Sequence, residues 1–262
     1  MSIASPGIAG NNRDMIRVDD LRKSFKAVRA LDGLSFDAPD GRVTGLIGPN
    51  GAGKTTALRI LCTVMKPDSG SATIDGFDTA THRQAAQQQL GVVPDSRGLY
   101  PRMTAREHIL YCGRLHGMVE NDLAARIDEL TALLGMAEFI DRRARGFSKG
   151  QMRKVALARA LVHRPRNILL DEPTNGLDIG SSRAVHDIIR RLRDDGCCIV
   201  FCSHIMKEVA DISDQVVVMA NGRAAACGTV PDLLEQTGAS DIEGVFLKLT
   251  GQCDVDAHEA AQ

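Results

Sequence analysis

The feature that most limits what this chain can fold into lies between residues 43 and 65. VTGLI is typical of a buried strand, and KTTALRILCTVM is typical of a helix. The residues that join them, Gly48-Pro-Asn-Gly-Ala-Gly-Lys54-Thr55, fit the pattern GxxxxGK[ST]. Glycines let the backbone turn tightly and point its N–H groups inward, and the helix N-terminus adds positive potential. The stretch therefore predicts a strand–loop–helix unit that binds a phosphate chain.

The residues of this loop are expected to divide the work of binding a nucleotide. Lys54 reaches the β- and γ-phosphates, and Thr55 offers its hydroxyl to Mg²⁺. The alternative is a glycine-rich turn that binds nothing, which leaves Lys54 and Thr55 unexplained. The predicted nucleotide-binding residues of the loop are Gly48, Pro49, Asn50, Gly51, Ala52, Gly53, Lys54, Thr55 and Thr56.

A second apolar stretch ends in two carboxylates. Residues 167–173, NILLDEP, are typical of a buried strand that ends at Asp171 and Glu172. We expect Asp171 to interact with Mg²⁺ as an outer partner, and Glu172 to orient or deprotonate the water that attacks the γ-phosphate. Taken alone, Glu172 would be a solvated loop carboxylate. Beside Asp171 and the phosphate loop, it is predicted to be catalytic.

The rest of the chain alternates strands and helices, which predicts an α/β fold with a mostly parallel sheet. One block, about residues 96–146, has only helical patterns and is expected to be an inserted subdomain. Further strands are expected at 16–25, 31–39, 71–76, 90–95, 197–204 and, as two closing strands, within 215–229. Further helices are expected at about 81–90, 149–163, 180–195 and 206–213.

Composition narrows the classes of function. The net charge of −1 gives no overall field that attracts nucleic acid, and aromatic residues at 3%, with no Trp, leave few platforms for stacking bases. No stretch approaches the roughly 18 apolar residues that cross a bilayer, and the N-terminus lacks the features of a signal peptide. We therefore expect a cytosolic location.

The cysteines point to the same compartment. They form no CxxC pair, so we expect reduced, buried, hydrophobic cysteines rather than a disulfide framework or a zinc site. They are Cys62, Cys112, Cys197, Cys198, Cys202, Cys227 and Cys253.

The order of the motifs resembles the ATP-binding cassette (ABC) ATPases. The resemblance covers about residues 15–240 and rests on five motifs: GPNGAGKTT at 48–56, FSKGQ at 147–151, ILLDEP at 168–173, GLD at 176–178 and SH at 203–204. It implies a P-loop NTPase core with an antiparallel β subdomain and the helical insertion, preceded by a flexible tail at 1–14 and followed by a C-terminal helix and tail at 241–262. It also implies ATP and Mg²⁺ as ligands.

In this family two nucleotide-binding domains stack head to tail, with ATP between the P-loop of one domain and the signature motif of the other. The resemblance therefore implies that Ser148, Gly150 and Gln151 bind ATP across a dimer interface. It places Asp178 in the loop that links the two sites, and it makes His204 a contact for the γ-phosphate and the attacking water.

Two of these positions have competing interpretations. Phe25 would stack on adenine in the family, where Tyr is usual, but a core aromatic is the alternative. The signature helix could also be a simple N-capped helix with a basic solvated face, which accounts for Arg153 and Lys154. Its apolar positions, which are expected to pack against the protein, are Met152, Val155, Ala156 and Ala160.

The sequence departs from the family at two motifs. The usual signature is LSGGQ, so Phe147 and Lys149 differ; Lys149 either adds charge near the phosphate or points to solvent. The family usually has Gln after the strand near residue 90, where this chain has Pro94-Asp95. Because a carboxylate also binds Mg²⁺, directly or through water, the expected metal-binding residues are Thr55, Asp171 and Asp95.

The segment after Asp95, GLYPRMTAREHILYCGRLHG, resembles the ATPases of sodium-extrusion (Nat-type) and drug exporters. We therefore expect an ATPase subunit that powers an exporter through a separate membrane subunit, contacted by the 96–146 block, and that works as a homodimer or paired cassette. A soluble ABC ATPase that acts on ribosomes or DNA is the alternative. The signature motif and His204 argue against a nucleotide kinase, and Glu172 with His204 argues against a non-hydrolysing cassette.

Overall fold

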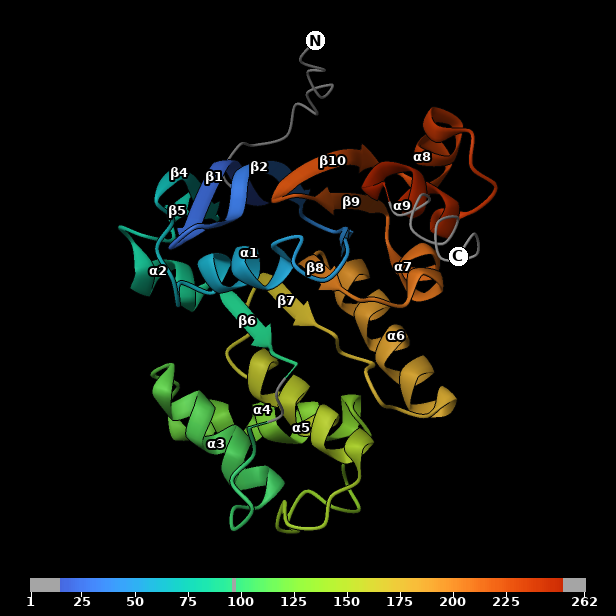
Figure 1. Ribbon diagram of the computed structural model, residues 1–262. Coiled ribbons are helices and arrows are strands. Elements are labelled where there is room, and N and C mark those ends of the chain that lie inside the picture. The colour runs from blue at the N-terminus through green and yellow to red at the C-terminus, as the bar shows by residue number, and fades with distance from the viewer. Residues whose placement is uncertain (1–14, 96–97, 252–262) are drawn as a thin grey trace.

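The computed structural model describes residues 15–95 and 98–251. The expected tail at 1–14 and the chain end from residue 252, including Cys253, lie outside the described residues. Two sheets form the upper part of the molecule in Figure 1, and a helical block lies below them. The six-stranded sheet has the order β10-β9-β3-β8-β7-β6, and the four-stranded sheet has the order β2-β1-β4-β5.

The six-stranded sheet is parallel from β9 to β6, and only β10 runs antiparallel, so the expected mostly parallel sheet is confirmed. Its strands are β3 (Val43–Ile47), β6 (Leu90–Val93), β7 (Asn167–Asp171), β8 (Cys198–Cys202), β9 (Gln215–Ala220) and β10 (Arg223–Gly228). The other sheet is antiparallel throughout, with strands β1 (Met15–Phe25), β2 (Val28–Pro39), β4 (Ser69–Ile74) and β5 (Phe77–Asp78).

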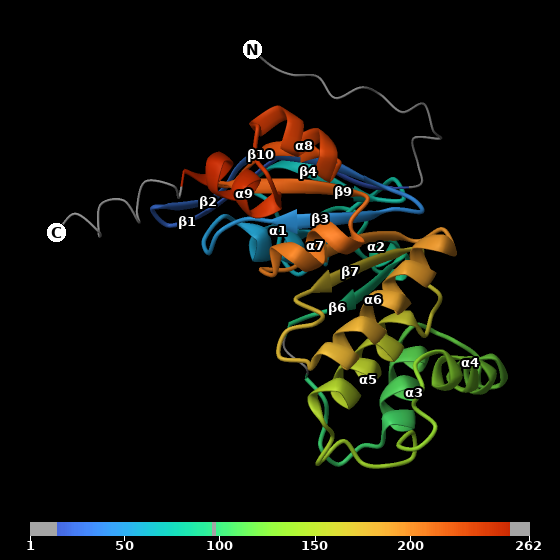
Figure 2. The ribbon, with the colours of Figure 1, turned by 90° about the vertical axis from the view of Figure 1, so that its right-hand side faces the viewer.

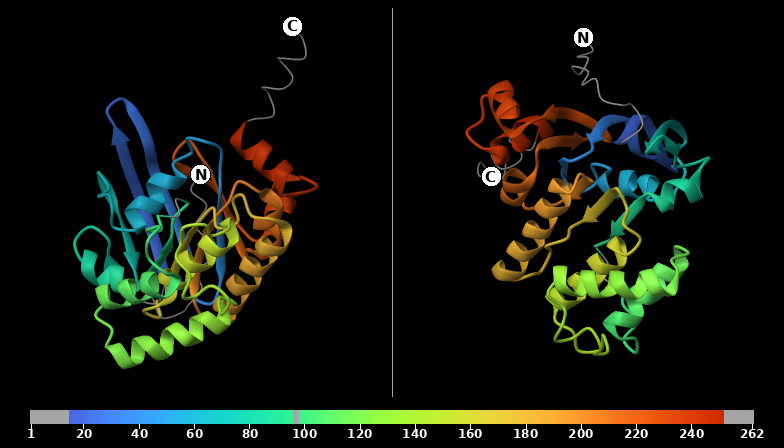
Figure 3. Two further views of the ribbon diagram at one scale, coloured as in Figure 1. Left: turned by 90° about the horizontal axis from the view of Figure 1, so that it is seen from below. Right: turned by 180° about the vertical axis from the view of Figure 1, so that it is seen from behind.

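The helices cover both faces of the parallel sheet. Helix α1 lies between the two sheets, and α3, α4 and α5 gather on the side away from the antiparallel sheet (Figure 2). In the view from behind in Figure 3, α6 runs along the side of the sheet, and α7 packs against α6 and α9. The helices are α1 (Lys54–Leu61), α2 (Arg83–Gln88), α3 (Ala105–Leu115), α4 (Glu120–Leu133), α5 (Lys149–Leu161), α6 (Ile179–Asp194), α7 (Met206–Ile212), α8 (Val230–Thr237) and α9 (Ile242–Thr250).

The central strands are apolar without interruption because both of their faces are buried. Successive side chains point to opposite faces, so β7 sends Ile168 and Leu170 to one core and Leu169 to the other. The first core joins the sheet to α3–α7 and α9, and the second joins it to α1 and the antiparallel sheet. These two cores hold the loops at the ends of β3, β7 and β8 in fixed positions.

Local signals in the sequence set several helix starts. Thr104 and Glu107 form a capping box at the start of α3, and Ser148 and Gln151 form one at the start of α5. Helix α1 ends at Leu61 rather than near residue 65, because Thr63 takes a left-handed conformation with φ of 59°. Strand β5 and helix α8 were not expected from the sequence.

The expectation for the cysteines is wrong at one position. Cys198 and Cys202 are buried and Cys62, Cys112 and Cys197 are partly buried, but Cys227 on the outer strand β10 is exposed. Helices in the described ranges are all too short or too polar to span a bilayer.

Candidate active site

The phosphate loop follows β3 and opens α1, as its sequence predicts. Gly53 is the N-cap of α1 with a left-handed φ of 101°, and a Cβ there would collide with the Ala30 carbonyl. The position therefore requires glycine. Lys54 Nζ donates hydrogen bonds to the Gly48 carbonyl and, at 3.1 Å, to the Pro49 carbonyl, so its ammonium group lies over the loop.

One cavity of about 1500 Å³ brings most of the predicted residues together. The whole loop from Gly48 to Thr56 lines it. From more distant parts of the sequence, the predicted residues that line the same cavity are Phe25, Asp95, Asp171, Glu172 and His204. A space of this size at the carboxyl ends of parallel strands is where α/β folds bind nucleotides.

The carboxylates at the end of β7 lie close to other charges. Burial raises the pKa of Asp171, and the neighbouring Glu172 and Asp95 carboxylates raise it further, whereas Lys54 and Arg153 oppose the rise. Burial also lowers the pKa of Lys54. Within the described residues, His, Cys, Asp and Glu side chains nowhere gather in threes that could hold a metal unaided. Mg²⁺ takes one or two protein carboxylates and completes its shell with phosphates and water, and the Asp171 and Asp95 carboxylates at this cavity fit that requirement.

Glu172 and His204 form a direct pair. His204 Nδ1 and Glu172 Oε2 are 2.7 Å apart, although the two residues follow different strands, β7 and β8. The Glu172 side chain is 18% exposed and that of His204 is 62% exposed, so the carboxylate is sheltered while the imidazole reaches solvent. Glu172 also has a left-handed φ of 48°, which costs a non-glycine residue about 1–3 kcal/mol and is maintained only by surrounding contacts.

Phe25 is not a core aromatic. It is 43% exposed at the end of β1 and faces the nucleotide cavity, with Lys23 Nζ 5.9 Å from its ring centroid. An exposed ring at the rim of such a cavity suits stacking on a base.

The signature residues lie outside this cavity. Ser148 Oγ accepts from the Gln151 N–H at 3.1 Å, and Gln151 Oε1 accepts from the Ser148 N–H at 3.0 Å. Asp178 caps α6 in the same manner, accepting from the Ser181 N–H at 2.9 Å. Ser148, Lys149 and Asp178 are all exposed, so Lys149 points to solvent. Within one chain, these residues do not meet the phosphate loop.

The basic solvated face proposed for the signature helix is wrong for Arg153. Its side chain is completely buried, while Lys154 is only partly exposed and donates to the Gly135 carbonyl at 3.3 Å. Helical spacing puts Arg153 on the same stripe as Ala156, Leu157 and Ala160, which are buried. That periodicity was the signal in the sequence that could have placed Arg153 inside.

A buried polar cluster behind the catalytic loops was also missed. Thr174, which follows Glu172, donates to Glu208 Oε2 at 2.5 Å, and Ser203, which precedes His204, lies 3.5 Å from the same oxygen. His186 on α6 approaches the other oxygen of Glu208 at 3.7 Å. No spacing in the sequence connects these residues, because they come from four separate elements.

Comparison with known proteins agrees with this geometry. Residues 31–175 match the sequence family described as ABC transporter. The chain belongs to this family. It is 41% identical over 238 residues to the ABC transporter ATP-binding protein NatA of Bacillus subtilis (strain 168), an alignment that covers 89% of this chain and 97% of NatA. It is 32% identical over 241 residues to the Nod factor export ATP-binding protein I of Ralstonia nicotianae, covering 92% and 75% of the two chains.

Solved structures agree in fold. A structure titled as the ATP-binding subunit of an ABC transporter superposes with a TM-score of 0.83 at 27% identity, covering 90% of this chain and 99% of the other. The chain is thus an ATP-binding, ATP-hydrolysing subunit of an ABC transporter, and the expected fold class and family are confirmed.

The raised pKa of Asp171 predicts a stability effect with a definite sign. When the pKa of a carboxyl is higher in the folded protein than in the unfolded chain, ionising it costs more free energy in the folded protein. At pH 7.5 the negative charge of Asp171 therefore lowers the free energy of unfolding. Asp171→Asn should therefore raise the melting temperature of the nucleotide-free protein at pH 7.5. The rise should be about 2–4 °C for each kcal/mol gained in the free energy of unfolding. The gain should shrink as the pH falls and Asp171 takes up its proton.

Thermal melts at a series of pH values measure this effect. Glu138→Gln, which neutralises an exposed carboxylate, is the matched control and should change the melting temperature little. A destabilised Asp171→Asn protein at pH 7.5 would contradict the electrostatic explanation.

Proposed function

We propose that this ATPase subunit drives an exporter, works as a pair of cassettes, and binds a separate membrane subunit at the inner face of the cell membrane. The main support for the proposal is that some of the family motifs line one cavity while the signature motif does not. One cavity collects the phosphate loop with Asp171, Glu172 and His204, whereas the exposed Ser148 and the half-buried Gly150 do not line it. The relatives include a Nod factor export ATP-binding protein, which favours export over a role on ribosomes or DNA.

The side chains that line the cavity have separate roles in binding and hydrolysing ATP. The loop N–H groups and Lys54 bind the β- and γ-phosphates, and the exposed Phe25 ring stacks on adenine. Thr55, Asp171 and Asp95 hold Mg²⁺, which supplies positive charge against the phosphate oxygens when it is bound.

Glu172 acts as the base in this scheme. Its carboxylate accepts a proton from the attacking water, and the 2.7 Å contact with His204 Nδ1 keeps that carboxylate directed at the cavity. His204, mostly exposed, is free to reach the γ-phosphate from the same position.

Glu172→Gln tests the hydrolytic assignment. The amide keeps the shape but cannot accept the proton, so turnover should fall about 100-fold or more, the usual loss for a general base. Binding of ATP should change little, because Glu172 is not part of the phosphate loop. Steady-state ATPase assays and calorimetric titration with ATP measure both quantities.

The exposed Glu235→Gln variant is the matched control and should hydrolyse ATP at the wild-type rate. A Glu172→Gln protein with wild-type turnover would remove Glu172 from the mechanism.

Two copies complete each site. Ser148 and Gly150 begin α5, whose N-terminal N–H groups and dipole favour a negative phosphate. Because Ser148 is exposed and neither residue lines the cavity of its own chain, we assign both to the γ-phosphate bound by a second copy. Gln151 closes the cap on Ser148 and so fixes the start of the helix. Asp178 caps the start of α6 by accepting a hydrogen bond from the Ser181 N–H, and Ser181 lies beside Gly150.

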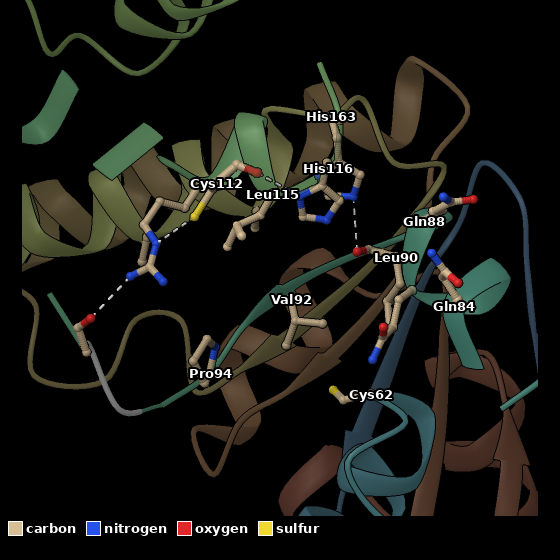
Figure 4. A pocket seen from close by; sticks show the side chains of 16 residues that line it. Cys62, Gln84, Gln88, Leu90, Val92, Pro94, Cys112, Leu115, His116 and His163 are labelled. Atoms are coloured by element: carbon tan, nitrogen blue, oxygen red, sulfur yellow. Dashed lines mark hydrogen bonds between the residues drawn. The ribbon is translucent and has the colours of Figure 1, made fainter. Parts of the chain in front are cut away.

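The membrane subunit is assigned to a groove between the helical block and the rest of the molecule, here called the subdomain groove. Its volume is about 740 Å³, and it is lined by α2, β6, α3 and α5 and by Cys62 just after α1. Figure 4 shows Leu115 and His116 on one side, Gln84 and Gln88 on the other, and Pro94 below them beside Val92. The groove shares Cys62, Val92 and Pro94 with the nucleotide cavity, so an occupant here lies next to the ATP site.

The chemistry of the subdomain groove indicates what it binds. The His116 and His163 rings stack with centroids 3.7 Å apart, and burial with the neighbouring His116 lowers the pKa of His163 to about 4. His163 is therefore neutral at physiological pH. The remaining lining is mostly apolar or amide, apart from Arg159. This surface suits an amphipathic helix that presents apolar side chains and one carboxylate.

Leu115→Asp tests this docking. Leu115 is 67% exposed at the groove, and a charge there opposes an apolar partner. The fraction of the protein that sediments with membranes of its own cell should fall about tenfold, which corresponds to a loss of roughly 1.4 kcal/mol of binding free energy. ATPase activity of the purified chain should not change.

Val119→Asp is the control, because Val119 is 62% exposed but does not line the groove. A Leu115→Asp protein that stays with the membranes would exclude this groove as the docking site. Sedimentation of the wild type with ribosomes instead would favour the soluble alternative.

A further inference from the structure

Arg153 is the largest side chain that is fully buried in the described part of the chain. It lies on α5, five residues after Ser148, and so belongs to the helix that carries the signature motif. A buried cation is tolerated only where hydrogen bonds compensate for the lost water. The partners of this guanidinium therefore indicate why it is there.

Two hydrogen bonds of this guanidinium go to backbone carbonyls of functional loops. Nη2 donates to the Glu172 carbonyl at 2.9 Å, and Nη1 donates to the Pro94 carbonyl at 3.2 Å. The first loop follows β7 and the second follows β6, which are neighbouring parallel strands. One planar group thus connects two loops that are 78 residues apart in the sequence.

The Glu172 end of this connection is under conformational constraint. Glu172 has a left-handed φ of 48°, its N–H donates to the Cys202 carbonyl at 2.9 Å, and its carbonyl also accepts from the Asn175 N–H at 3.2 Å. A charge-assisted bond from Arg153 strengthens the hold on that carbonyl. The direction of the Glu172 side chain follows from the orientation of this peptide unit.

The Pro94 end faces two functional spaces. Pro94 lines the nucleotide cavity and the subdomain groove, where Figure 4 shows it near Val92, and Asp95 next to it lines the nucleotide cavity. Arg153 therefore joins the Glu172 carbonyl to a loop that borders both spaces.

We propose that Arg153 is a positioning residue for ATP hydrolysis, which holds the Glu172 backbone in register with the Pro94 loop and the signature helix. This inference rests on the catalytic role proposed for Glu172. It concerns the placement of Glu172 and not the binding of nucleotide, because Arg153 does not line the nucleotide cavity.

The geometry requires arginine in particular. The guanidinium is rigid, always charged, and presents several donors in one plane, so it reaches both carbonyls at once. A lysine ammonium on a flexible stem has a different donor geometry, and methionine has no donor. Arg153→Lys should therefore show an intermediate defect and Arg153→Met the full one.

Arg153→Met in the full chain tests the proposal. The kcat for ATP should fall about 10- to 100-fold, the scale of loss when a catalytic group is displaced by about 1 Å. KM and the calorimetric Kd for ATP should stay within about twofold of wild type. Lys154→Met removes the neighbouring cation on the same helix and should leave kcat unchanged, because Lys154 donates to the Gly135 carbonyl, away from the catalytic loops.

The outcomes are separable. A wild-type kcat in Arg153→Met would overturn the proposal, and so would a loss of ATP binding in proportion to turnover, which indicates general disruption. If Arg153→Met does not fold, as judged by circular dichroism, Arg153→Lys decides the question. A reduced kcat with normal ATP binding agrees with the proposal, and a normal kcat refutes it.

Glu172→Gln separates this inference from the proposed role of Glu172. If Glu172→Gln retains turnover, the proposed role of Glu172 has failed. If Glu172→Gln is inactive and Arg153→Met has a normal kcat, only this inference fails.

Discussion

The alignment of three parallel strand ends determines where the chemistry of this protein takes place. Cys202 at the end of β8 pairs with Leu46 of β3 on one side and with Asp171 of β7 on the other. The phosphate loop, the carboxylates and the loop with His204 therefore leave the sheet at one level. Parallel pairing requires long crossovers, so residues that are more than 100 positions apart in the sequence share one edge.

Burial on both faces keeps that alignment fixed. The two cores use alternate residues of the same strands, so a shift of register by one residue would exchange the contents of both cores. The cost of such an exchange keeps the pairing in a single register. This packing maintains the strained backbone at Glu172 and the half-buried charge of Asp171. Both features lower the stability of the fold, and both place groups that the site needs.

The sequence predicted the parts of the site that depend on local pattern. Lys54 and Thr55 follow an apolar strand after the glycine-rich loop, and Asp171 and Glu172 stand at the end of another, so the alternation of strands and helices predicts their common edge. The alternative interpretation of the signature helix placed Arg153 on a solvated face, because a cation is normally solvated. Its buried partners are backbone carbonyls, which the sequence does not reveal.

Contacts between distant elements were also beyond the sequence. Phe246 of α9 lines the nucleotide cavity, although the helix comes from the far end of the described chain. The Glu208 cluster with Thr174 and Ser203 likewise depends on how α7 packs against two loops. Helix α8 carries a capping box at Thr229 and Asp232 with Pro at its first turn, so its start was marked in the sequence but was not recognised.

The central claim is that ATP bound by one copy is closed in by Ser148 and Gly150 of another. The most direct test is the solution mass of Glu172→Gln by light scattering, with and without ATP and Mg²⁺, because slow hydrolysis should keep the closed state populated. We predict a shift from monomer to dimer on addition of ATP, which Ser148→Arg in the same background should abolish. A mass that stays monomeric while calorimetry shows that ATP is bound would contradict closure by two copies of this chain alone.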